Sequence, residues 1–237
     1  MSLGQSLGWR ARLVQYPLAQ TEWEEVILKL VEHNPDARLL SLGYGDGAFT
    51  SRVAHRIGTA HVSAIEIVPE YVKAAQARGI AAVAGDLNAR FPFDDESFDV
   101  VLSNHDIEHV SNTDRLLQEC RRMLKKGGYM VISTPNLGAL HNLVFLLLGK
   151  QPLMAEVSDE AIVGNWGTPR RRVTPAEPAH RRLFTASALR ELLQWHRFRV
   201  ERVIRSGFRP FPGPLARILA AVFPLYSTTI TAKARKA

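Results

Sequence analysis

Short apolar runs alternate with amphipathic stretches through the first half of this chain. Runs of strand length occur at residues 38–42, 61–67, 80–83, 98–103 and 129–133. Between them the apolar positions recur at helical spacing, at about residues 48–57, 69–78 and 113–124. Pro69 stands at a first helical position and Gly58 and Gly79 at helix ends. Strands that alternate with helices through short turns predict an α/β fold with a doubly wound, mostly parallel sheet and helices on both faces.

A further helix precedes the first strand. Thr21 is its predicted N-cap, and the helix runs from Glu22 until Asn34 and Pro35 stop it. Residues 1–20 show no clear periodicity, so we expect a leader that covers part of the core.

The alternation stops after residue 136. Residues 137–182 contain the apolar piece Leu143–Leu148 and then a loop rich in glycine, proline and arginine. An insertion of this length at a functional sheet edge indicates a lid or substrate loop after strand five. Regular order returns with a helix at 186–195, a strand at 199–204, an amphipathic piece at 215–223 and a last strand near 228–234. We therefore expect one domain over residues 1–237, with a cofactor core at 36–136, a lid at 137–183 and a C-terminal part at 184–237.

Composition narrows the class of protein. The 237 residues are 46% hydrophobic and 22% charged, which is typical of a soluble globular chain. The single cysteine, Cys120, excludes an intramolecular disulfide and a cysteine-based metal site, and it falls on the apolar side of a predicted helix. We see no secretory signal and no apolar run long enough to span a bilayer, so we expect a cytoplasmic protein. The net charge of +7 suits an anionic substrate, a nucleic acid or an acidic membrane surface without choosing among them.

A glycine-rich turn follows the first predicted strand. Gly43, Gly45 and Gly47 alternate there, and Glu66 ends the second strand. A glycine turn into a helix N-terminus is a nucleotide-site geometry, and an acidic residue at the second strand end can accept hydrogen bonds from ribose hydroxyls. With Ala48 the turn also satisfies the dinucleotide pattern G-x-G-x-x-G/A, whereas G-x-G-x-G is the S-adenosylmethionine (SAM) pattern. A purely structural turn is the third alternative.

Further polar residues stand where predicted strands end. Asp86 follows the third strand and Asn104 the fourth. Because parallel strands end at one edge of a sheet, we expect both residues to meet the glycine turn and Glu66 at that edge, where such sheets bind ligands.

These features resemble the motifs of class I SAM-dependent methyltransferases, and most closely the small-molecule group that includes ubiquinone-type O-methyltransferases. The resemblance covers roughly residues 36–136 in five ordered blocks: Leu40–Thr50, Ala64–Ile67, Gly85–Leu87, Phe98–Asn104 continuing through Ile107–Val110, and Leu116–Pro135. It implies a seven-stranded Rossmann-like sheet whose last strand runs antiparallel. His180–Thr185, after the insertion, also looks like a recurring element of this group.

The resemblance implies SAM as the cofactor and S-adenosylhomocysteine as its product. Glu66 would bind the ribose, Asp86 would accept from the adenine amino group, and the Leu87 backbone N–H would face the same ring. The implied cofactor-binding residues are Ser41, Gly43, Tyr44, Gly45, Gly47, Glu66, Ile67, Asp86, Leu87 and Asn104. The chain departs from the family pattern at two of them, because Ser41 replaces an acidic residue and Tyr44 a small one. We expect Asp46 to compensate in part for the missing carboxylate.

Methyl transfer to a hydroxyl needs alignment of the nucleophile with the sulfonium methyl and benefits from a general base. His109 and His180 are the candidate bases, although each could instead be a packing or surface histidine. The resemblance to quinone O-methyltransferases, some of which bind a divalent metal, would make His105, Glu108 and His109 the matching ligands; we assign no metal. Arg170–Arg172 could clamp an anion or remain solvated.

The sequence thus predicts a SAM-dependent methyltransferase that transfers a methyl group to an oxygen atom of a small-molecule acceptor, of the cell-surface sugar, lipid or quinone-precursor type. Two alternatives stay open: a SAM-binding protein without catalysis, and an RNA methyltransferase, which only the positive charge favours. No base-amine motif follows strand four, so we expect no nucleic-acid partner. The apolar pieces 143–148 and 215–223, with basic neighbours, leave contact with a membrane or lipid open, and the oligomeric state is not determined.

Overall fold

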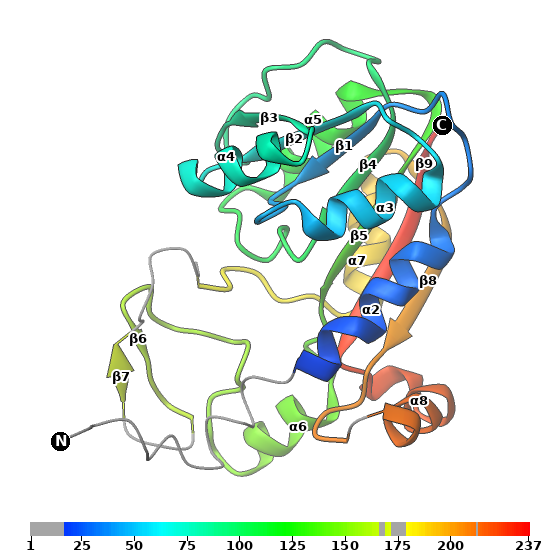
Figure 1. Ribbon diagram of the computed structural model, residues 1–237. Coiled ribbons are helices and arrows are strands. Elements are labelled where there is room, and N and C mark those ends of the chain that lie inside the picture. The colour runs from blue at the N-terminus through cyan, green and yellow to red at the C-terminus, as the bar shows by residue number, and fades with distance from the viewer. Residues whose placement is uncertain (1–16, 166–168, 172–178, 212) are drawn as a thin grey trace, which may run out of the picture.

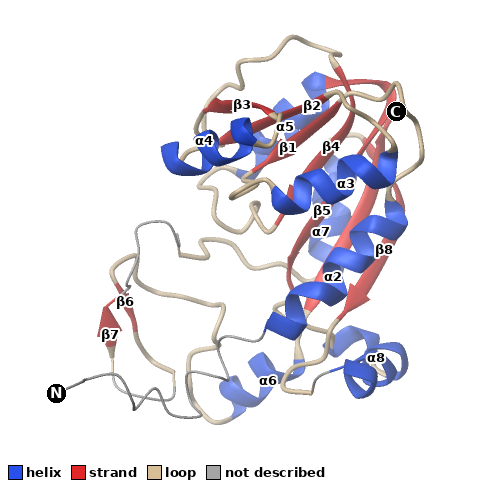
Figure 2. Cartoon of the chain, viewed as in Figure 1, coloured by secondary structure: helices blue, strands red, loops and turns tan. Residues whose placement is uncertain are grey.

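A seven-stranded sheet forms the centre of the computed structural model, which describes residues 17–165, 169–171, 179–211 and 213–237 (Figures 1 and 2). The strand order is β3-β2-β1-β4-β5-β9-β8. β9 runs antiparallel to both of its neighbours, and the other adjacent strands pair in parallel. The predicted doubly wound, mostly parallel sheet is confirmed. Its strands are β1 Leu39–Leu42, β2 Val62–Glu66, β3 Ala81–Ala84, β4 Phe98–Asn104, β5 Leu124–Pro135, β8 Phe198–Ser206 and β9 Thr229–Lys236.

Helices cover both faces of the sheet, and α4 packs beside β2 and β3. Successive side chains of a strand point to opposite faces of the sheet. In β1, Leu40 and Leu42 point into one hydrophobic core, and Leu39 points into the other. α5 and α7 complete the first core, and α2 and α3 the second. The bounds are α2 Pro17–Leu30, α3 Ala48–Ile57, α4 Pro69–Ala77, α5 Thr113–Met123 and α7 Ala186–Trp195.

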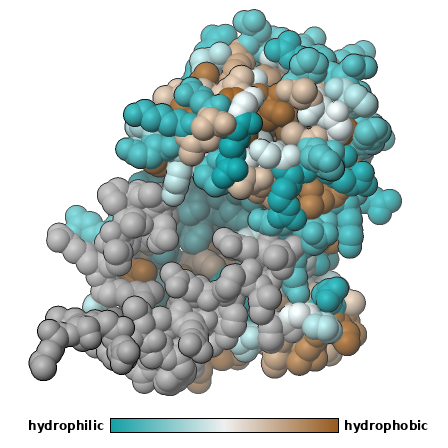
Figure 3. Space-filling model, in the orientation of Figure 1, coloured by the Kyte–Doolittle hydropathy of each residue, from teal (hydrophilic) through white to brown (hydrophobic). Residues whose placement is uncertain are grey.

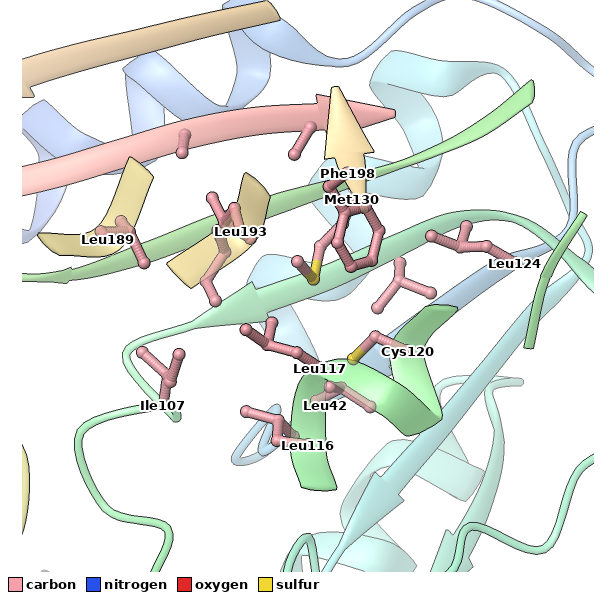
Figure 4. Close-up of a cluster of buried hydrophobic side chains, with 14 of the residues drawn as sticks. Leu42, Ile107, Leu116, Leu117, Cys120, Leu124, Met130, Leu189, Leu193 and Phe198 are labelled. Carbon is pink, nitrogen blue, oxygen red and sulfur yellow. The ribbon is translucent and has the colours of Figure 1, made fainter. Parts of the chain in front are cut away.

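Cys120 lies in the larger of these cores, between α5 and the sheet (Figure 4). Its neighbours Leu116, Leu117 and Met130 are fully buried. Burial raises the pKa of the Cys120 thiol, so the thiol stays protonated and unreactive at neutral pH. The expectation of a buried cysteine on the apolar side of a helix is confirmed.

Two predicted element boundaries were wrong. α2 begins at Pro17 rather than after Thr21, because proline is well tolerated in a first helical turn. β5 begins at Leu124, directly after α5, rather than at Tyr129. The pair of glycines that we expected to form an exit turn lies inside this strand, where the register against β4 shifts between Phe98 and Val100. A Cβ at Gly128 would lie 3.0 Å from the Asp99 carbonyl oxygen, so the close strand approach at this irregularity favours glycine.

The two apolar pieces that follow residue 136 are short helices. α6, Leu140–Leu147, follows β5, and α8, Gly213–Val222, follows β8 and leads into the 3-10 turn η1, Pro224–Tyr226. Both helices lie at the same end of the molecule (Figure 1). Between α6 and α7 the described chain forms a two-residue ladder of β6, Ala161–Ile162, with β7, Arg170–Arg171. None of the helices in the described ranges has the length and apolar character needed to cross a bilayer.

Candidate active site

The glycine turn connects β1 to α3 with left-handed backbone at all three glycines. The φ angles are +48° at Gly43, +58° at Gly45 and +80° at Gly47, a region that L side chains rarely adopt. A Cβ at Gly43 would lie 2.0 Å from Asp106 Oδ1, whereas one at Gly45 would meet nothing within 4 Å. The turn is therefore packed against the β4 loop at Gly43 and open at Gly45, where a ligand could approach the backbone.

Glu66, at the end of β2, is tied to this turn. Its Oε2 accepts a hydrogen bond from the Gly45 amide (3.2 Å), and its Oε1 accepts from the amides of Ile67 (2.9 Å) and Val68 (3.1 Å). A carboxylate offers about four acceptor positions, so these three contacts leave capacity for a further hydroxyl donor. The three backbone donors fix the carboxylate at the place where the sequence predicted a ribose ligand.

Apolar side chains flank the same edge. Ile67, directly after Glu66, is 65% exposed, and Leu87, after β3, is half-buried against the core. Asp86 is exposed, and its Oδ1 accepts from the Asn88 amide (2.8 Å) and side-chain Nδ2 (2.9 Å). Ile67 and Leu87 offer apolar surface suited to a planar base, with the carboxylate of Asp86 beside it.

The two residues that depart from the family pattern, Ser41 and Tyr44, differ in their hydrogen bonding. Ser41 is buried, and its Oγ lies 2.8 Å from Thr50 Oγ1 on α3. The Tyr44 hydroxyl is buried without a hydrogen-bond partner among the described residues, and burial with the nearby Glu66 raises its pKa to about 12. The partial compensation that we expected from Asp46 stays a prediction. Its side chain accepts from the Ala48 amide (3.0 Å) and pairs with Arg78 Nη2 (2.8 Å), which ties the glycine turn to the end of α4.

Asp106 is an acidic residue beside the glycine turn that the sequence analysis did not single out. It is 6% exposed, its Oδ1 lies against Gly43, and its Oδ2 accepts from Ser103 Oγ (2.9 Å). Burial and the nearby Glu108 carboxylate raise the pKa of Asp106 well above its usual range. The only sequence signal was its place just after β4, because contact with Gly43 depends on the tertiary fold.

The loop after β4 carries backbone strain at His105, whose φ is +63°. A non-glycine residue in this region costs about 1–3 kcal/mol and occurs preferentially at functional sites. The His105 ring contacts Trp23 of α2 (centroids 4.9 Å apart), and its Nδ1 lies 3.0 Å from Glu108 Oε1. The preceding Asn104 accepts a hydrogen bond from Ser133 Oγ (2.7 Å) through its side-chain oxygen. These contacts hold the loop at the sheet edge beside the glycine turn.

The structure brings the two candidate bases together. The rings of His109 and His180 stack with centroids 4.7 Å apart and planes 24° apart. The segment that carries His180 is docked on the β4 loop, since the Arg181 amide donates to the Glu108 carbonyl oxygen (2.7 Å). His180 also lies near Glu156, which accepts from the His180 amide (2.7 Å).

The protonation of His109 follows from its neighbours. Its Nδ1 lies 3.3 Å from the Ala179 carbonyl oxygen, which only accepts, so Nδ1 carries the proton and Nε2 keeps a lone pair. Burial lowers the pKa of His109 below its usual value, and the Glu108 carboxylate opposes this shift. His109 is thus a neutral imidazole at pH 7 with Nε2 able to accept a proton.

Glu108 completes a cluster with the two histidines. One ligand atom from each of Glu108, His109 and His180 lies within 4.8 Å of the others, a spacing that could hold a metal ion. Glu108 is buried, and its Oε2 accepts from Thr134 Oγ1 (3.0 Å). The set differs from the one that the resemblance implied, because His105 bonds to Glu108 and His180 stands in the group instead.

The predicted anion clamp at Arg170–Arg172 stays a prediction. Arg172 lies outside the described residues, as do the side chains of Arg170 and Arg171.

Comparison with known proteins shows what the first half of the chain is similar to. Residues 40–132 match the model of the methyltransferase domain family. The malonyl-[acyl-carrier protein] O-methyltransferase of Methylococcus capsulatus is 34% identical over 122 residues, which cover 48% of this chain and 44% of that protein. The ubiquinone biosynthesis O-methyltransferase of Xanthomonas oryzae is 36% identical over 106 residues, covering 42% and 44%. The chain thus spans less than half the length of each of these relatives.

Solved structures extend the likeness to almost the whole fold. The crystal structure of an S-adenosylmethionine-dependent methyltransferase from Mesorhizobium loti covers 89% of this chain and 96% of its own, with a TM-score of 0.59 and 19% identity. At that identity the likeness shows the fold alone. The match to the methyltransferase domain model thus covers residues 40–132, the part of the chain that contains the glycine turn and Glu66.

Proposed function

We propose that the chain transfers a methyl group from SAM to a hydroxyl oxygen of a small molecule, with His109 as the general base. The observation that carries this proposal is the Nδ1 contact of His109 with the Ala179 carbonyl oxygen, which leaves Nε2 as a proton acceptor. The O-methyltransferase names of the similar proteins support oxygen as the acceptor atom.

The cofactor would lie across the carboxyl edge of β1, β2 and β3. Glu66 would accept from the ribose hydroxyls, and Ile67 and Leu87 would enclose the adenine, with Asp86 at its amino group. The methionine end would then point along the glycine turn toward Asn104 and the β4 loop. This direction brings the sulfonium methyl toward the loop that carries His109.

Asp106 would replace the carboxylate that Ser41 lacks. It approaches Gly43 from the β4 side, so it can face the ammonium group of the methionine end. A protonated Asp106 would ionise when that cation arrives, because a nearby positive charge favours the carboxylate. SAM binding would then release a proton, which calorimetry in buffers of different ionisation enthalpy detects.

The reaction itself would be an in-line displacement. The acceptor oxygen attacks the SAM methyl carbon as the bond from that carbon to sulfur breaks, and the hydroxyl proton passes to His109 Nε2. The segment at residues 179–182 would position His180 over His109 and exclude water from the acceptor. Quinone-type precursors and lipids with a free hydroxyl are the acceptor classes that we propose first.

The test uses SAM labelled in its methyl group and pools of extracted small molecules. We expect label to enter an organic-extractable product, and His109→Gln to lower kcat by about 100-fold or more, the usual contribution of a general base. His55→Gln, an exposed histidine on α3, is the matched control and should retain activity. Full activity of His109→Gln would exclude this histidine as the base.

A metal chelator distinguishes the role of His109 as a general base from a role as a metal ligand. With His109 acting as the base, activity should survive the chelator, and S-adenosylhomocysteine should bind wild type and His109→Gln equally. Loss of activity with the chelator and its return with a divalent cation would mean that His109 binds a metal.

A further inference from the structure

The end of the molecule formed by α6, α8 and η1 exposes an unusual amount of apolar surface. Figure 3 shows apolar side chains gathered at the lower end of the molecule, over α8. The exposed large apolar residues, which we call the α6–α8 face, are Leu146, Leu147, Leu148, Leu215, Ile218, Val222, Phe223, Leu225 and Tyr226. Soluble proteins rarely expose contiguous apolar patches of this kind unless the patch contacts a partner or a membrane.

The sequence of α8 places its larger side chains outward. Ala216 and Ala220, one turn apart, are buried and pack with Phe208. Ile218 and Val222, on the opposite side, are 60% and 61% exposed. A helix that only covered a core would bury its large residues and expose small or polar ones. The pattern therefore indicates that the outer side of α8 has a partner.

α6 and α8 are joined by shared packing and by a hydrogen bond to η1. Leu140 of α6 and Leu219 of α8 pack against the same small cluster around Phe208. Asn136, which precedes α6, donates through its side chain to the carbonyl oxygen of Leu225 in η1 (2.9 Å). Leu147, at the end of α6, is 86% exposed.

The segments that build this face carry cations and no carboxylate of their own, and the carboxylates nearest to α8 are Glu22 and Glu25 of α2, which line a pocket with Arg217. Residues 137–155 contain no aspartate or glutamate, and neither does any position after Glu201. Lys150 lies just beyond α6, and Arg217 is exposed on α8. Segments that combine exposed apolar side chains with lysine and arginine are complementary to an anionic bilayer, where these cations gain from the negative surface potential.

Arg209 adds a second, independent observation. It lies next to Phe208 and near His141 of α6, and its Nε is buried without a hydrogen-bond partner among the residues the structure describes. Both ring nitrogens of His141 are likewise buried and unpartnered there. Burial lowers the pKa of Arg209, and no carboxylate opposes that shift. Arg209 itself is half-buried, and an arginine with an unpartnered Nε and no carboxylate beside it is a group that a phosphate would satisfy.

We propose that the α6–α8 face docks this protein on the surface of an anionic phospholipid bilayer, with Arg209 facing the headgroup phosphates. The face begins where β5 ends, so docking presents the carboxyl edge of the sheet, with the glycine turn and His109, to the membrane. An acceptor that resides in the bilayer can then reach the site without crossing water.

The test is sedimentation of the full chain with vesicles. Vesicles of phosphatidylcholine with an equal part of phosphatidylglycerol should bind the wild type, pure phosphatidylcholine should bind it weakly, and high salt should weaken the binding further. The double variant Leu147→Glu, Ile218→Glu should lower the partition coefficient by on the order of tenfold or more, since it removes two apolar anchors and adds two anions. Trp195→Glu, at an 81% exposed residue of α7, is the matched control and should bind as wild type does.

A second pair of variants tests the headgroup contact. Arg209→Gln should reduce the preference for phosphatidylglycerol, whereas Arg190→Gln, an exposed arginine on α7, should leave it unchanged. Thermal unfolding and S-adenosylhomocysteine binding establish that each variant is folded.

Three results would overturn the proposal. The first is wild-type protein that stays in the supernatant with anionic vesicles. The second is a loss of binding in Trp195→Glu as large as in the double variant. The third is self-association of the wild type without vesicles that the double variant abolishes, which would assign the face to a second copy of this chain.

Discussion

Replacing Gly43 by alanine tests the contact between the cofactor turn and the β4 loop. Alanine at φ +48° carries a left-handed strain of about 1–2 kcal/mol. Its methyl group would also lie 2.0 Å from Asp106 Oδ1 and 2.9 Å from Cγ, so the buried carboxyl must move. Overpacking of this kind costs about 1–3 kcal/mol more. We expect Gly43→Ala to lower the free energy of unfolding by about 2–5 kcal/mol.

Gly45→Ala is the matched control within the same turn. Its φ of +58° gives a similar backbone strain, but a Cβ there meets nothing within 4 Å. We therefore expect a loss of only about 1–2 kcal/mol in the free energy of unfolding. Because the open space over Gly45 is where the cofactor would approach, its affinity for S-adenosylhomocysteine should nevertheless fall.

A double-mutant cycle isolates the steric part of the Gly43→Ala effect. Asp106→Ala removes Oδ1 and Cγ, and the remaining Cβ is 3.7 Å away, an ordinary contact. In that background Gly43→Ala should cost only the backbone strain, which gives a coupling energy of about 1–3 kcal/mol. Equilibrium unfolding in urea, followed by tryptophan fluorescence without ligand, measures all four proteins. Additivity within about 0.5 kcal/mol, or equal losses for Gly43→Ala and Gly45→Ala, would refute the reasoning.

Three further predictions concern the charged groups of the site. Glu66→Ala should weaken S-adenosylhomocysteine binding by about 1–3 kcal/mol in a calorimetric titration, while Glu70→Ala on α4 should not; equal affinities would misplace the ribose contact. Because the pKa of His109 is lowered, the imidazole stays neutral and able to act as a base below pH 6.5. The fall of kcat/KM on the acidic side of its pH profile should therefore lie below pH 6.5. A fall that begins at or above pH 7 would contradict this assignment. The raised pKa of Asp106 means that the native state keeps a proton that the unfolded state releases, so wild-type stability should fall relative to Asp106→Asn as pH rises above about 4, by at most about 1.4 kcal/mol per pH unit; parallel stability curves would contradict it.

Local patterns in the sequence were sufficient to predict the strands of the sheet and the residues at its carboxyl edge. Each strand is a short apolar run, and Gly43 and Glu66 stand at strand ends that a parallel sheet must bring together. The start of β5 was missed because Gly127 and Gly128 signal a turn locally, whereas the pairing of Leu124 with Phe98 keeps them in the strand.

The tertiary contacts that complete the candidate site could not be predicted from local sequence patterns. Asp106 lies against Gly43 only because β4 and β1 are neighbours, and its sequence context gave no sign of that approach. His109 and His180 were separate candidates in the sequence, and their stacking depends on backbone hydrogen bonds between the β4 loop and residues 181 and 182. The outward apolar side of α8 was visible as an amphipathic piece, but which side is buried is decided by packing on Phe208.

The central claim is that the edge formed by the glycine turn and Glu66 binds SAM, and calorimetric titration with S-adenosylhomocysteine tests it most directly, with NAD as the control ligand. The account predicts saturable binding of S-adenosylhomocysteine at one site per chain, weakened in Glu66→Ala, and no binding of NAD. Failure to bind S-adenosylhomocysteine, or binding that Glu66→Ala leaves unchanged, would contradict the account.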